Sequence, residues 1–304
     1  MKIQSLSFLG IRGLRDASFD LTQRESGAPH DVVVFTGRGA SGKTRALEAI
    51  VATKEAIAPY GPMVPGAPWI AVGSPVAKIK IAFHLDDEEM TFARASSKVV
   101  EAEVTFHPQR ARGEADDGLI ALLGRYSHDP ALGKLEYFPA ARRIPVLPPF
   151  GGLGTAEQRL LRAGKDARKY GFVVRFLRDL EGEPLRAQAF AALLEGLSPS
   201  LRYVAQPSEG LPRCLSSHGG LPVTPADISD SEADAVIFAA TAVGLGLGRS
   251  LLLIDRPDQY VDAAFMKRFV TGLRALGQGN QLVLASSSPE LIEAATPGAV
   301  LTLE

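Results

Sequence analysis

The chain has 304 residues, of which 46% are hydrophobic, and 33 basic and 34 acidic side chains give a formal net charge of −1. This length suits one large domain or two ordinary ones. The balanced charge excludes a general electrostatic attraction to nucleic acid or to an anionic membrane. The single cysteine, Cys214, excludes an internal disulfide framework, and neither it nor the five histidines show metal-ligand spacing. Because no long apolar segment is present, we expect a soluble, cytoplasmic protein with no membrane partner.

The N-terminal part predicts a hairpin, a strand and a helix. Residues 1–21 alternate apolar and polar side chains on both sides of a glycine-containing turn at 10–13, which is typical of a half-buried hairpin. The apolar run 32–35 predicts a strand, and residues 44–57 carry the spacing of a helix with one apolar side.

A glycine-rich segment, GRGASGKT, joins that strand to that helix. It comprises Gly37, Arg38, Gly39, Ala40, Ser41, Gly42, Lys43 and Thr44. The spacing GxxxxGK[ST] between a strand and a helix is typical of a phosphate-binding loop, although a chance glycine-rich turn is the alternative. Glycines let the backbone fold round an anion, Lys43 would reach the β and γ oxygens, and Thr44 would offer its hydroxyl to Mg²⁺. The segment therefore predicts a site for ATP and Mg²⁺.

The middle of the chain begins with β structure. Residues 79–85 and 100–106 alternate strictly, which predicts antiparallel strands with one wet face, and residues 108–118 predict a loop. A short strand at 135–138 leads into PAARRIPVLPPFGG, which is either a functional loop or a linker.

A helical pattern follows from Thr155 to about Leu197, with interruptions near Gly182 and Pro184. Four basic residues fall on one third of a helix circumference: Arg159, Arg162, Lys165 and Lys169. They could contact a nucleic-acid backbone or form an ordinary solvated face. The chain shows no sustained heptads, so we expect no coiled-coil arms.

The C-terminal part predicts buried parallel strands covered by helices. After a loop at 210–227, a polar start at 228–232 precedes an apolar helix, and the aliphatic run 251–255 ends in a carboxylate. A helix at 263–276, a strand at 281–285, a short helix and a strand at 300–303 complete the chain. Continuous aliphatic strands separated by helices indicate an α/β fold.

Several segments together resemble one family. SFLGIRGLRDASFDL, the phosphate loop, LLLIDRPDQYVD and LVLASSSPELI are similar to the ABC-type ATPases of the RecF, SMC and OLD group, and most of all to compact members without coiled-coil arms. The resemblance implies an α/β P-loop NTPase fold: one ABC-ATPase-like head over 1–304 with an antiparallel β subdomain and a helical lobe. Residues 1–135 would hold the phosphate loop and the β subdomain, 155–200 the lobe, and 225–304 the signature, Walker B and switch strand.

The resemblance also implies a role for the segment 228–232. ISDSE stands where the family has its signature LSxGE, which meets the γ-phosphate bound by a second subunit, so that ATP joins two heads. Ser229 and Glu232 would take part in this contact. Ser231 replaces the family's glycine, and a plain helix N-cap is the alternative explanation.

Family positions around the γ-phosphate are only partly kept. Asp255 matches the Walker B aspartate, which would hold the Mg²⁺ shell opposite Thr44, and Asp262 matches the D-loop aspartate. Arg256 stands where the catalytic glutamate is expected, and a guanidinium cannot act as a general base. Ser287 stands where the switch histidine is expected.

These departures predict an ATP-binding switch with slow or absent hydrolysis, which acts on a partner protein or DNA; by resemblance, the pathway would be DNA repair or phage defence. One alternative is a hydrolysing motor, in which Arg256 stabilises transition-state charge and Asp258, or Glu232 of a second copy, orients the water. A second alternative is a structural subunit without nucleotide. The expected partners are a second copy of the chain and another protein, with DNA as a further possibility.

Overall fold

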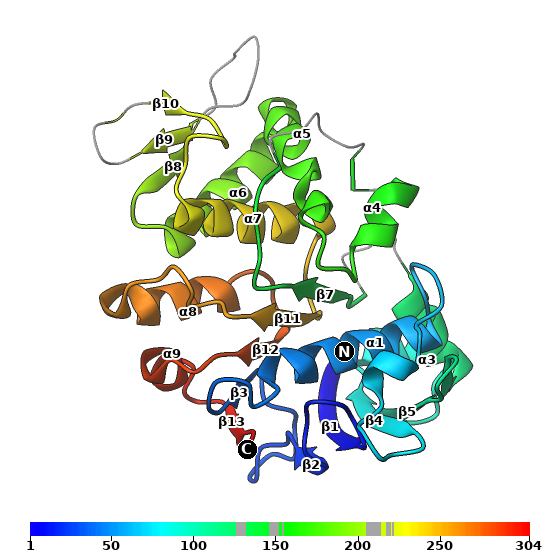
Figure 1. The fold of residues 1–304 in the computed structure, drawn as a ribbon. Coiled ribbons are helices and arrows are strands. Elements are labelled where there is room, and N and C mark those ends of the chain that lie inside the picture. The colour runs from blue at the N-terminus through cyan, green and yellow to red at the C-terminus, as the bar shows by residue number, and fades with distance from the viewer. Residues whose placement is uncertain (126–131, 146–151, 154, 205–213, 217–219, 221) are drawn as a thin grey trace.

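A computed structural model describes residues 1–125, 132–145, 152–153, 155–204, 214–216, 220 and 222–304, and Figure 1 shows the fold. The expected mixed α/β architecture is confirmed. Two five-stranded sheets and one three-stranded sheet carry the described strands.

The central sheet is parallel and has the strand order β13-β3-β12-β11-β7. Its strands are β3 (Val32–Thr36), β7 (Leu135–Phe138), β11 (Leu251–Asp255), β12 (Gln281–Ala285) and β13 (Ala299–Thr302). The three middle strands of this order are buried almost throughout, which is why their sequences are continuous aliphatic runs. Parallel strands end at one edge, so the segments after β3, β11 and β12 meet there.

The second sheet is antiparallel and has the order β2-β1-β4-β5-β6. It contains β1 (Lys2–Leu9), β2 (Ala17–Asp20), β4 (Ala77–His84), β5 (Val99–Phe106) and β6 (Ala111–Ala115). The hairpin predicted at the N-terminus and the two alternating strands are all present in it. The alternation has the expected cause, because residues such as Ile79, Ile81 and Val104 are buried while Lys78 and Lys80 are exposed.

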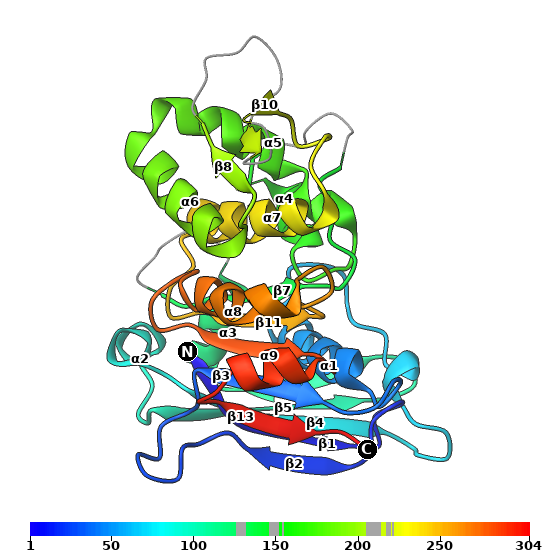
Figure 2. The same ribbon diagram turned by 90° about the vertical axis from the view of Figure 1, so that its left-hand side faces the viewer.

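Helix α1 (Lys43–Ile57) lies between the two sheets, and helices of the lobe cover the opposite face of the central sheet (Figures 1 and 2). Successive residues of β3 point alternately into two hydrophobic cores, one on each face of the central sheet. Val33 and Phe35 pack toward α1 and the antiparallel sheet, whereas Val32 and Val34 pack toward the lobe. The phosphate loop at the start of α1 is therefore held by both cores.

The segment 155–200 contains α4 (Ala156–Leu161), α5 (Phe172–Asp179) and α6 (Pro184–Leu197), with short 3-10 turns η2 (Ala167–Tyr170) and η3 (Leu180–Gly182). Helix α7 (Asp230–Leu245) packs against α5 and α6, and the term lobe includes it from here on. A small sheet of β8 (Leu201–Tyr203), β9 (Cys214–Ser216) and β10 (Pro222–Val223) adjoins it. After β11 come η4 (Ala263–Phe265) and α8 (Met266–Arg274), and α9 (Pro289–Ala294) follows β12. In the described part of the chain, no helix is both long and apolar enough to cross a bilayer.

Two expected loops are only partly loops. Residues 108–118 are not a loop throughout, because β6 pairs with β5. Residues 214–216 and 222–223 of the expected loop 210–227 are strands, while 210–213, 217–219 and 221 lie outside the described residues. The acidic run at 86–89 begins α2 (Asp87–Ala93), which Asp86 caps in a capping box with Glu89. Helix α3 (Asp117–Gly124) and the 3-10 turn η1 (Ala67–Trp69) complete the elements.

Candidate nucleotide site

The loop between β3 and α1 has a backbone that requires glycine. Gly37 and Gly42 have φ of 141° and 95°. A Cβ on Gly37 would lie 2.3 Å from the carbonyl oxygen of Leu303, and one on Gly42 would lie 2.4 Å from that of Gly13. A side chain at either position would collide with these carbonyl oxygens. Only glycine therefore lets the loop pack against the residue after β13 and against the turn between β1 and β2.

Lys43 is turned back over the loop. Its Nζ donates hydrogen bonds to the carbonyl oxygens of Gly37 at 2.8 Å and Arg38 at 2.7 Å. The first turn of α1 has no acidic residue and no side-chain cap. Its free N–H groups and the nearby ammonium form a concentrated positive region, which favours an anion such as a phosphate.

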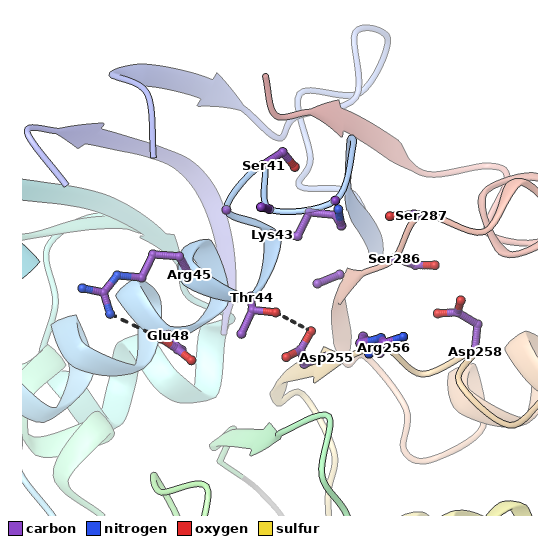
Figure 3. Close-up of a pocket in the computed structure, with 14 residues that line it drawn as sticks. Ser41, Lys43, Thr44, Arg45, Glu48, Asp255, Arg256, Asp258, Ser286 and Ser287 are labelled. Carbon is purple, nitrogen blue, oxygen red and sulfur yellow. Dashed lines mark hydrogen bonds and ion pairs between the residues drawn. The ribbon is translucent and has the colours of Figure 1, made fainter. Parts of the chain in front are cut away.

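Thr44, at the start of α1, and Asp255, at the end of β11, lie together at the edge of the parallel sheet where its strands end. The Thr44 hydroxyl donates to Asp255 Oδ1 at 3.0 Å (Figure 3). Asp255 is 2% exposed, and burial raises its pKa, although the hydrogen bond from Thr44 and the charge of Arg142 act in the opposite direction. One carboxylate and one hydroxyl suit Mg²⁺, which usually takes its other ligands from phosphates and water.

These groups line a cavity of about 590 Å³. It extends from Arg45 and Glu48 on α1, past Thr44 and Asp255, to Ser287 and Asp258 (Figure 3). A cavity of this volume is in the usual range for ligand pockets. Arg45 and Glu48 line the cavity although they were not among the predicted site residues. Glu48 is four positions after Thr44 and therefore lies on the same side of the helix, which is a signal that the sequence does carry.

Arg256 has a left-handed backbone, with φ of 48°, and its side chain is exposed at the cavity. Its N–H donates to Ala285 O at 2.9 Å and its carbonyl accepts from Arg142 at 3.1 Å. These two bonds hold the backbone of Arg256 in the left-handed conformation, which is strained for a residue with a Cβ. A left-handed residue with a Cβ costs about 1–2 kcal/mol, and such strain is often found at functional sites.

Two further predicted residues reach the same cavity. The Ser287 hydroxyl donates to Gly37 O at 3.1 Å, which ties the end of β12 to the phosphate loop. Asp258 Oδ1 is buried and has no hydrogen-bond partner among the described residues. An unsatisfied carboxylate oxygen beside a cavity is a ready acceptor for water or for a ligand.

Ser229, Glu232 and Asp262 lie outside the cavity lining of their own chain. Ser229 is the N-cap of α7 and forms a capping box with Glu232, whose carboxylate also accepts from Ser200 Oγ at 2.7 Å. Asp262 precedes η4 and makes no side-chain cap. The helix-cap explanation of ISDSE is thus confirmed locally, and any contact with phosphate would require a second chain.

The four basic residues do not form one exposed helix face, so neither the DNA-binding face nor the solvated face is made by all of them. The segment 155–197 is broken into several helices, and Arg162 and Lys169 are 2% and 0% exposed. Arg162 forms a bidentate pair with Glu136, and Lys169 donates to two backbone carbonyls and lies 3.4 Å from Glu136. Only Arg159 and Lys165 remain exposed, and Lys165 pairs with Glu48.

The fold was compared with the sequences and the structures of known proteins. No protein-family model matches the chain, and no curated protein matches its sequence. Solved structures do match over nearly the whole length. An SMC head bound to the C-winged helix domain of ScpA has a TM-score of 0.61 and 15% identity, covering 97% of this chain and 92% of that one.

An SMC head of Thermotoga maritima has a TM-score of 0.52 and 12% identity, with 97% and 93% covered. The recombination mediator RecF, solved as RecF-ATPrS, has a TM-score of 0.54 and 11% identity, with 99% and 96% covered. The predicted resemblance to SMC and RecF heads is therefore confirmed at the level of the fold.

Proposed function

We propose that this chain is an ATP-binding switch that holds Mg²⁺ and ATP and hydrolyses ATP slowly or not at all. One observation carries the proposal: the phosphate loop, Lys43 and the Thr44–Asp255 pair are assembled, whereas Arg256 occupies the position beside Asp255 where a catalytic carboxylate would act.

Residues of this chain fit each part of the nucleotide. The loop amides and Lys43 would hold the phosphates, and Thr44 and Asp255 would hold Mg²⁺. Bound Mg²⁺ would neutralise phosphate charge. Release of Lys43 from its two carbonyl contacts would let its ammonium reach a phosphate oxygen without moving the backbone.

Slow hydrolysis follows from the chemistry of the side chains near the γ-phosphate position. A guanidinium stays protonated and cannot accept a proton from water. Ser287 donates its hydroxyl to the loop instead of presenting an imidazole. Without a base, binding energy stabilises the ATP-bound state without lowering the barrier to hydrolysis.

A second candidate function is an active ATPase, and Asp258 favours it. Its buried Oδ1 without a partner could orient the attacking water, while Arg256 stabilises negative charge in the transition state. The third candidate is a structural subunit without nucleotide. It would not explain the glycine-dependent loop or the contact between Thr44 and Asp255.

ATP would act by joining two copies of the chain. Ser229 at the N-terminus of α7 offers a hydroxyl and a helix dipole to the γ-phosphate of a second copy. The dimer would then present a surface to another protein, as the SMC head does to ScpA, or to DNA. A role in DNA repair or phage defence rests on the resemblance alone.

The test measures ATP binding, phosphate release and molecular mass on the wild-type chain and Lys43→Ala. The switch predicts Mg²⁺-dependent ATP binding, a mass increase with ATP, and little phosphate release. Turnover at rates common for enzymes, about 10 s⁻¹, that disappears in Lys43→Ala would support the active ATPase instead. Absence of ATP binding would leave the structural subunit.

A further inference from the structure

A buried arginine connects the nucleotide cavity to helix α7. Arg142 follows β7, is 2% exposed, and does not line the cavity. Its Nη1 donates to Pro139 O at 2.8 Å and to Asp255 O at 2.7 Å, and its Nη2 donates to Arg256 O at 3.1 Å. The guanidinium thus holds two consecutive carbonyls at the point where β11 enters the site.

The other side of the same guanidinium holds α7. Nε and Nη2 donate to the two carboxylate oxygens of Asp234 at 3.0 and 2.6 Å, a bidentate pair in which Asp234 is 4% exposed. The guanidinium also lies 5.2 Å from the ring centre of Phe238, one turn further along α7. Three protein segments therefore meet on one planar group: the residues after β7, the end of β11 with Arg256, and α7.

We propose that Arg142 is a positioning residue that couples occupancy of the nucleotide cavity to the position of α7. The inference rests on the proposed function, since it specifies how the cavity communicates with the helix that Ser229 caps. Arg142 touches neither the cavity nor its contents. It acts through the carbonyls of Asp255 and Arg256, whose side chains face the cavity.

Burial makes this connection stiff. A guanidinium in a buried site must keep its hydrogen bonds, because an unpaired buried charge is strongly destabilising. Its planar fork also fixes the direction of each bond, which a lysine cannot do. A shift of the Asp255–Arg256 backbone on nucleotide binding would therefore move Asp234 and α7 with it.

The chain offers a matched control for the loss of a buried ion pair. Arg162 and Glu136 form an equally buried bidentate pair, with exposures of 2% and 3%, and Glu136 also lies on β7. This pair joins β7 to the segment around Lys169, where Arg162 donates to Lys169 O at 3.4 Å. Neither residue lines the nucleotide cavity or belongs to α7.

The experiment measures hydrogen–deuterium exchange of the full chain with and without MgATP, in peptides from the phosphate loop and from the part of α7 around Asp234. The protein concentration is one at which light scattering shows a monomer with MgATP, so slower exchange in α7 does not come from association of two copies. In the wild type, MgATP should slow exchange in both regions, by about tenfold in α7, a typical size for coupling between sites. Asp234→Asn should keep the response of the phosphate loop and lose that of α7. Glu136→Gln should keep both responses.

Arg142→Lys provides a second variant, which keeps the charge but loses the bidentate fork, and it should behave like Asp234→Asn. An α7 response that survives in both variants, or that Glu136→Gln abolishes equally, would overturn the inference. A wild type in which only the phosphate loop responds would overturn the coupling but leave nucleotide binding intact. If the phosphate loop itself does not respond, the proposed function fails, and the coupling fails with it.

Discussion

Replacing Arg256 by glutamate should create an ATPase. The backbone at this position is fixed by its N–H bond to Ala285 O and by the bond from Arg142 to its carbonyl. Because arginine and glutamate both carry a Cβ, the cost of the left-handed backbone is nearly the same in both proteins. Arg256→Glu therefore changes the group that faces the cavity while leaving its direction unchanged.

The expected gain follows from the chemistry of a positioned base. General base catalysis contributes about 10²–10⁴-fold to rate, equivalent to a barrier lower by about 2.7–5.4 kcal/mol. The assay is phosphate release at saturating MgATP, confirmed by a single-turnover measurement that separates chemistry from product release. Arg256→Gln is the control, because it removes the positive charge without supplying a base.

Two results would refute this reasoning. If Arg256→Glu and Arg256→Gln raise turnover equally, the effect is loss of a positive charge and not gain of a base. If the wild type already hydrolyses ATP briskly and Arg256→Glu slows it, Arg256 stabilises the transition state, and Asp258, with its unpaired buried oxygen, becomes the group to test next.

Three other predictions concern binding, pH and assembly. Lys43→Ala should weaken ATP binding by about 30- to 160-fold, which corresponds to a charge-assisted hydrogen bond of about 2–3 kcal/mol. Calorimetry on a protein whose melting temperature is unchanged measures this loss, and an unaltered affinity would exclude the loop as the phosphate site. Burial raises the pKa of Asp255, and only its carboxylate form binds Mg²⁺. The Mg²⁺-dependent affinity for ATP should therefore fall as the pH is lowered through this raised pKa. Asp255→Asn should show a low affinity that does not depend on pH in this way. Ser229→Asp should keep the helix cap and the melting temperature but abolish the increase in molecular mass with ATP. Ser229→Ala should lower the stability by about 1 kcal/mol, because it removes the cap. ATP-dependent dimers of Ser229→Asp would show that this helix end does not meet phosphate.

The sequence could predict the elements whose signals are local. The phosphate loop was recognisable because its spacing and its flanking strand and helix lie within about 25 residues, and the structure confirms that strand and helix as β3 and α1. Strict alternation in β4 and β5 and aliphatic runs in β11 and β12 likewise reflect burial on one face or on both. The β6 strand was missed because ARGEA is short and its less polar side carries only Ala111, Gly113 and Ala115, so its pairing with β5 defines it.

Only the tertiary structure could decide which charged residues face a ligand and which are buried. Arg162 and Lys169 looked like a solvated or DNA-binding face on a single helix, but the segment is broken, and Glu136 from β7 draws both of them into the interior. Arg142 and Asp234 are 92 positions apart, so no spacing rule could pair them. The sequence by itself determined a strand and a helix joined by GRGASGKT, which has the spacing of a phosphate loop, and it placed Arg256 directly after Asp255. The packing of β7 against β11 and α7 decided how that site is connected to the rest of the molecule, because hydrogen bonds between distant segments exist only once the sheet has assembled.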